Sequence, residues 1–150
     1  MNEKSMKMAE SFLKRAWNKL NEAREYLKEW KFSESISASQ ECIELSIKAI
    51  YLLLCGKYPK GHKFKEEDFE TILENIPEEL KYLEIHKLYL YSKFWAEFYT
   101  IAKYGLERVG VGADKLFEEE EARLALKHAE KCHLAASSIK TYIQYHSARE

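Results

Sequence analysis

The sequence predicts an all-α protein, an up-and-down antiparallel helical bundle of four long helices plus one short helix, formed by a single domain over residues 1–150. Five glycines and two prolines are few for 150 residues, whereas strand-rich domains place turn residues every ~8–12 positions. Apolar side chains also recur at steps of three and four, as on amphipathic helices. With 46% hydrophobic and 33% charged residues, the chain has the composition of a globular domain.

Local signals set the helix boundaries. Ser33 is the expected N-cap of the second helix, and Gly56 is the residue expected to end it. Pro77 stops the third helix and can begin the fourth, which is apolar almost all round and should be buried on several sides or lie at a subunit interface. The helices are expected over residues 6–30, 33–55, 66–75, 78–104 and 118–146.

Charge and cysteine content limit the classes of function. With 24 basic and 25 acidic residues the net charge is −1, so no long-range attraction to DNA is indicated, although a local basic patch could exist. Cys42, Cys55 and Cys132 form no CxxC pair and are expected to be reduced, packed thiols. No segment has the pattern of a signal peptide or a membrane span, so we expect a cytoplasmic protein without a membrane partner.

A row of polar residues crosses the apolar second helix. Gln40, Glu44 and Lys48 are spaced four residues apart and therefore share one edge of the helix. One interpretation is a solvated stripe in which Glu44 and Lys48 form an ion pair worth about 0.2–0.5 kcal/mol. The other is a functional groove, to which His62 in the following loop could contribute.

Several further motifs follow one another along the chain. They are Ala16, Trp17 and Ala23 in the first helix, Gln40, Glu44, Lys48 and Ala49 in the second, Pro59 and His62 in the next loop, Lys103 and Tyr104 at the end of the fourth, and the alanine-rich stretch 120–136 in the last. Their order resembles that of the HEPN domains (higher eukaryotes and prokaryotes nucleotide-binding), in particular the small stand-alone archaeal and bacterial type.

This resemblance implies a helical bundle that is usually a homodimer and is often encoded beside a minimal nucleotidyltransferase, in some cases as a toxin–antitoxin pair. It also implies a ligand, either a nucleotide or RNA. The implied ligand-binding residues are Gln40, Glu44, Lys48, His62, Lys103 and Tyr104.

Catalytic members of the family are metal-independent ribonucleases with an arginine followed four to six residues later by a histidine. Here Lys103 stands where that arginine is expected, and Lys lacks the bidentate geometry of Arg. Arg123 and His128 match the spacing, but five residues on a helix turn the side chains roughly 140° apart. We therefore expect a binding module rather than an enzyme. A ribonuclease acting through Arg123 and His128, or through Lys103 and His62, remains one alternative, and a structural adaptor the other.

A metal site is the last possibility raised by the sequence. His128 and Cys132 are four residues apart and could share an ion, with His133 beside them. A structural zinc site needs four ligands, and no others are evident nearby. We expect no metal and no cofactor.

Overall fold

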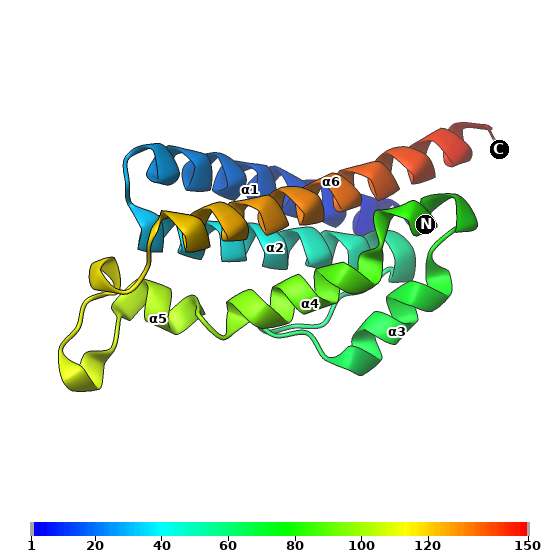
Figure 1. Ribbon diagram of the computed structural model, residues 1–150. Coiled ribbons are helices and arrows are strands. Elements are labelled where there is room, and N and C mark those ends of the chain that lie inside the picture. Colours follow the sequence, from blue (N-terminus) through cyan, green and yellow to red (C-terminus); the bar gives the residue numbers. More distant parts are fainter. Residues whose placement is uncertain (1, 150) are drawn as a thin grey trace.

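The computed structural model describes residues 2–149 and confirms an all-α bundle. Helix α2 is central (Figure 1): α1 and α6 lie along one side of it, and α3, α4 and α5 lie along the other. The α-helices are α1 (Glu3–Lys28), α2 (Phe32–Cys55), α3 (Glu66–Asn75), α4 (Ile85–Ala96), α5 (Tyr99–Tyr104) and α6 (Glu119–Arg149), and the 3-10 helices are η1 (Glu78–Leu83), η2 (Glu107–Val109) and η3 (Ala113–Lys115).

Most residues of α2 are buried, because other helices surround it. Several of the buried residues are serines, whose small side chains let a neighbouring backbone come close. Ser35 Oγ, for example, donates a hydrogen bond to the carbonyl oxygen of Ala23 at 2.8 Å. Gly56 ends the helix in the left-handed conformation at φ 75°, as expected. The predicted Ser33 cap is wrong: Lys31 occupies the N-cap, and Ser33 Oγ instead donates to Glu34 Oε1 at 2.6 Å.

The expected fourth helix is not continuous. Glu84 adopts the left-handed conformation (φ 53°, ψ 53°) between η1 and α4, and the N–H of Phe98 bonds the Trp95 carbonyl between α4 and α5. Each break changes the phase of the apolar face, so that Leu80 in η1, Trp95 in α4 and Ala102 in α5 are all buried. Packing of these side chains therefore overrides the helical continuity that the sequence predicts, and α5 becomes a separate element on α2.

The positions of α3 and α6 agree with those predicted from the sequence. Helix α3 covers the expected residues, and α6 begins with the acidic run Glu119 to Glu121. Between α5 and α6 the chain forms η2, η3 and an isolated bridge that pairs Leu106 with Val111. All three cysteine thiols are free. Among the residues described, no helix is both long and apolar enough to cross a membrane.

Candidate functional site

The polar row of α2 is largely enclosed by the fold. Gln40 is 3% exposed, and the side chains of Lys48 and Glu44 are 13% and 11% exposed. Lys48 Nζ lies 2.9 Å from Glu44 Oε1. The solvated-stripe interpretation is therefore wrong, because an ion pair so shielded from water is screened far less than a surface pair.

Glu44 also fixes the loop of residues 57–65 to α2. His62 Nδ1 lies 3.0 Å from Glu44 Oε1, although the His62 side chain is 79% exposed. A carboxylate at Nδ1 favours the form of the ring that carries a proton there and directs Nε2 away from the carboxylate. The loop histidine is thus oriented by a buried residue while most of its ring surface faces solvent.

Tyr99, the first residue of α5, lies between His62 and Lys103. The His62 and Tyr99 rings are stacked, with centroids 6.3 Å apart and planes 15° apart. Lys103 Nζ is 4.8 Å from the centroid of the Tyr99 ring and 3.6 Å from Glu41 Oε1, and Tyr99 Oη donates to the same Glu41 oxygen at 3.4 Å. The hydrogen bond between Lys103 and Tyr99 raises the pKa of the Lys103 amine above its ordinary value.

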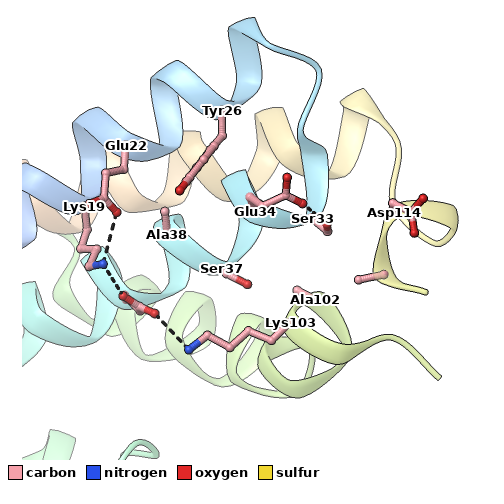
Figure 2. Close-up of a pocket in the computed structure, with 12 residues that line it drawn as sticks. Lys19, Glu22, Tyr26, Ser33, Glu34, Ser37, Ala38, Ala102, Lys103 and Asp114 are labelled. Atoms are coloured by element: carbon pink, nitrogen blue, oxygen red, sulfur yellow. Dashed lines mark hydrogen bonds and ion pairs between the residues drawn. The ribbon is translucent and has the colours of Figure 1, made fainter. Parts of the chain in front are cut away.

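Two pockets flank this group. The His62 pocket, a cavity of about 290 Å³, is lined by Gln40, Glu44, His62, Lys63, Ala96, Tyr99 and Thr100. Within it Gln40 Oε1 is buried, with no hydrogen-bond partner among the described residues. The Ser37 pocket, about 430 Å³, lies between α1, α2, α5 and η3 (Figure 2) and is lined by Lys19, Glu22, Tyr26, Ser33, Glu34, Ser37, Ala38, Glu41, Ala102, Lys103, Ala113 and Asp114.

The structure therefore groups only part of the predicted ligand-binding set. Gln40, Glu44, Lys48 and His62 belong to one connected cluster. Lys103 lines the Ser37 pocket instead, and the Tyr104 side chain is exposed.

Sequence reasoning misses two residues of this region. The apolar pattern places Tyr99 in the core of a long helix, but it stands four residues before Lys103 and so shares its helix face. Glu41 follows Gln40 in the sequence but lies outside the polar row. It contacts Tyr99 and Lys103 of α5 and Lys19 of α1, two segments distant in the sequence, and spacing alone does not reveal these contacts.

The loop of residues 57–65 is strongly basic. Its sequence, KYPKGHKFK, has four lysines and one histidine and no acidic residue. All four lysines are exposed, and one of them, Lys63, lies 3.7 Å from Glu97 of α4. This is a local basic patch on a chain whose overall net charge is −1, and composition alone could not locate it.

Arg123 and His128 have different partners. The Arg123 guanidinium pairs with Glu119 at 2.9 Å on the surface of α6. His128 Nδ1 accepts a hydrogen bond from Trp95 Nε1 at 2.9 Å, and its ring stacks on Tyr91 with centroids 3.9 Å apart. Burial lowers the pKa of His128 to about 4, so the ring is neutral and packed against α4. The structure does not bring this pair to a common cavity.

The residues considered for a metal site do not assemble into one. Cys132 is fully buried, and burial raises its pKa well above the ordinary value, which disfavours the thiolate that a metal needs. The ring of His133 lies 5.4 Å from that of Trp17. Within residues 2–149 no three His, Cys, Asp or Glu side chains are grouped so that they could hold a metal ion.

Comparison with known proteins defines the class to which this bundle and its polar row belong. The HEPN domain matches residues 9–138, so the chain belongs to the HEPN domain family. Among solved structures, the chain is similar to the crystal structure of TT1696 from Thermus thermophilus, with a TM-score of 0.66 and 21% identity over 87% of this chain and 97% of that chain. At this level of identity the likeness shows that the two chains share a fold. No curated protein matches the sequence.

Proposed function

We propose that this HEPN domain is a non-catalytic module that binds a phosphate-bearing base, either as a free nucleotide or within single-stranded RNA, at the mouth of the His62 pocket. The observation that carries the proposal is the stacked His62–Tyr99 pair, held by Glu44 beside the basic loop 57–65. The pair supplies a flat surface for a base, and the loop supplies cations for phosphate.

The geometry supports this division of roles. The 79% exposure of the His62 side chain leaves its ring free to stack on a base, so that a ligand would extend the existing stack by one ring. Such stacking contributes about 1–3 kcal/mol per base and tolerates any base. Lys57, Lys60 and Lys63 can neutralise phosphate, which makes binding depend on salt. The Gln40 amide, at the inner end of the pocket, can meet the edge of a base.

The test is a titration of the intact protein with a fluorescently labelled unstructured RNA, followed by anisotropy at several salt concentrations, with ATP titrated in parallel by calorimetry. We expect saturable binding that weakens with salt and is reduced in the double variant Lys60→Ala/Lys63→Ala. The double variant Lys4→Ala/Lys7→Ala, which removes two exposed lysines of α1, serves as the control. The proposal is wrong if neither ligand binds, or if both double variants lose affinity equally.

A ribonuclease is a second candidate, favoured by one observation. His62 and Lys103 both contact the Tyr99 ring, and His62 is oriented by Glu44 in the manner of a general base with its carboxylate. Lys103 could then stabilise phosphate charge. A gel assay on total RNA decides it: cleavage that disappears in His62→Ala supports the ribonuclease, and the absence of cleavage by the wild-type protein excludes it under those conditions.

The proposal extends to partners. A homodimer and a minimal nucleotidyltransferase, as in toxin–antitoxin pairs, are the partners expected for a small HEPN protein. Co-purification of the chain with the product of a neighbouring nucleotidyltransferase gene tests the second of these. If such a gene is present and its product does not bind the chain, that partnership is wrong while the ligand site stays unaffected.

A further inference from the structure

The Ser37 pocket has a chemistry different from that of the His62 pocket. We propose that it binds the ammonium group of a small aliphatic amine of the diamine or polyamine class. The proposal is independent of nucleotide or RNA binding, since it rests on other residues: Glu34, Ser37 and Asp114. These line the end of the pocket away from Lys19 in Figure 2.

At the other end of the pocket the charges neutralise one another. Lys19 Nζ lies 3.2 Å from Glu22 Oε2 and 3.0 Å from Glu41 Oε2, and Lys103 Nζ lies 3.6 Å from Glu41 Oε1. Hydrogen bonds to Glu41 and then Glu22 raise the pKa of Lys19 against the opposing effect of burial. Two cations and two carboxylates thus form a chain with no net charge, which leaves little attraction for an added phosphate.

The Ser37 end carries an excess of negative charge. Glu34 accepts a hydrogen bond from Ser33 Oγ at 2.6 Å, and within residues 2–149 neither Glu34 nor Asp114 forms an ion pair with a lysine or arginine. The nearby Lys31 is directed to Glu29 instead, at 3.0 Å. Lys31 acts on Glu34 only at longer range. Two carboxylates therefore line the same cavity with no lysine or arginine paired to either of them, an arrangement that attracts a positively charged ligand.

Ser37 provides the second, independent indication of a ligand. The residue is 9% exposed, and its Oγ has no hydrogen-bond partner among the described residues. Figure 2 shows the hydroxyl pointing from α2 into the space between Glu34 and Ala102. A buried hydroxyl left unpaired lowers the stability of the fold. An ammonium group in this space could donate one proton to Ser37 Oγ and others to the two carboxylates.

The size and composition of the pocket favour an organic cation over a metal ion. Its volume of about 430 Å³ lies within the ~300–1,000 Å³ range of small-molecule sites, and methylene groups of an alkyl amine can lie against Ala38 and Ala102. A metal ion of the magnesium or calcium type needs a tighter shell of six or more oxygens. No such cluster of ligating side chains exists in the described part of the chain.

Calorimetric titration of the full chain with putrescine and with spermidine tests the proposal, with 1,4-butanediol as the uncharged analogue. We expect one saturable amine site, no binding of the diol, and affinity weakened roughly tenfold or more in Glu34→Gln and in Asp114→Asn, because each variant removes a charged acceptor. Glu70→Gln, which removes an exposed carboxylate of α3, is the matched control and should bind as the wild type does.

Ser37→Ala separates a ligand role from a structural one. Alanine favours the helix and removes the unpaired hydroxyl, so the variant should unfold at the same temperature as wild type or higher, yet bind putrescine more weakly. Absence of saturable amine binding, equal weakening in Glu70→Gln, or binding of a lysine peptide without binding of free diamines would overturn the proposal. RNA binding measured on the same variants reports separately on the His62 pocket.

Discussion

Glu44 is the carboxylate on which two segments of the chain meet. Its carboxylate pairs with Lys48 of the same helix and contacts His62 of the loop that follows, and the Glu44 side chain is mostly shielded from solvent. Removing Glu44 should therefore destabilise the fold more than breaking a surface ion pair does, because the Lys48 amine that remains is held where water solvates it poorly.

We predict that Glu44→Gln lowers the free energy of unfolding by about 1–3 kcal/mol, since it leaves Lys48 without its charged partner. The matched variant Glu119→Gln, which breaks the exposed pair with Arg123, should change it by less than about 1 kcal/mol. Urea unfolding of both variants measures the difference. Equal effects would show that the Glu44 pair behaves as a surface pair.

His128 makes the free energy of unfolding depend on pH, and the direction of the effect follows from the shift in its pKa. Burial, followed by the charges of Lys131 and Lys127, lowers its pKa from 6.5 to about 4. Between these values the unfolded chain binds a proton that the folded chain does not, so the free energy of unfolding falls as the pH drops from about 6.5 toward 4.

We predict that this fall is smaller in His128→Gln than in wild type, and unchanged in the control His86→Gln, whose side chain is exposed. Part of the fall should remain in His128→Gln, because burial also lowers the pKa of His133. Thermal unfolding from pH 7 to pH 4 checks the prediction, and identical pH profiles for His128→Gln and wild type would contradict it.

At the scale of residues, the sequence predicts which side chains form the polar cluster better than it predicts what surrounds them. Helical spacing places Gln40, Glu44 and Lys48 on one edge, and the family motif adds His62. Spacing within one helix cannot tell which edges other helices cover, so the burial of the row was not predictable. The contacts of Glu41 depend on how α1, α2 and α5 pack, which is again a tertiary property.

At the scale of elements, the periodicity of apolar residues predicts where helices form, but it does not predict whether a helix is continuous. The apolar run of residues 78–104 satisfies a helical pattern throughout, yet a left-handed residue at Glu84 and a break before α5 divide it. The sequence carries no proline or glycine at either break, so the local signals that mark helix ends were missing. The break before α5 positions Tyr99 against His62.

Gly105 sets the path of the chain after α5. It has φ 74°, and a Cβ there would collide with the carbonyl oxygen of Val111 and lie 2.7 Å from the amide nitrogen of Ala113. Gly110 has a similar φ of 69° but open space around it. Gly105 combines its φ with ψ −160°, a region essentially restricted to glycine, whereas Gly110 has ψ 29° and lies in the left-handed helical region. The two positions therefore differ both in steric room and in backbone strain.

We predict that Gly105→Ala lowers the free energy of unfolding by about 2–4 kcal/mol, the sum of overpacking and the strain of a backbone conformation essentially restricted to glycine. Gly110→Ala should cost about 1 kcal/mol, from strain alone. Chemical denaturation compares the two. A Gly110→Ala variant as unstable as Gly105→Ala would contradict the steric explanation.

At the scale of the whole molecule, the interrupted fourth segment leaves apolar side chains on the surface. Leu90 and Phe94 are one helical turn apart on α4 and are 62% and 46% exposed. Exposed apolar residues grouped in this way are typical of protein interfaces. They suit the homodimer expected for the family.

We predict a dimeric mass for the wild-type protein at micromolar concentration and a monomeric mass for Leu90→Glu/Phe94→Glu, in which two charges would be buried at the interface. Leu73→Glu, an exposed apolar position on α3, is the control and should remain dimeric. Analytical ultracentrifugation distinguishes these states. A monomeric wild-type protein would exclude this interface.

The central claim is that the His62–Tyr99 stack receives a base. Its most direct test is the dissociation constant for a short unstructured RNA, measured for wild type, for His62→Ala and for the control His86→Ala. If stacking on His62 contributes about 1–3 kcal/mol, His62→Ala should weaken binding roughly 5- to 150-fold, and His86→Ala should leave it unchanged. Equal dissociation constants for all three proteins would contradict the claim.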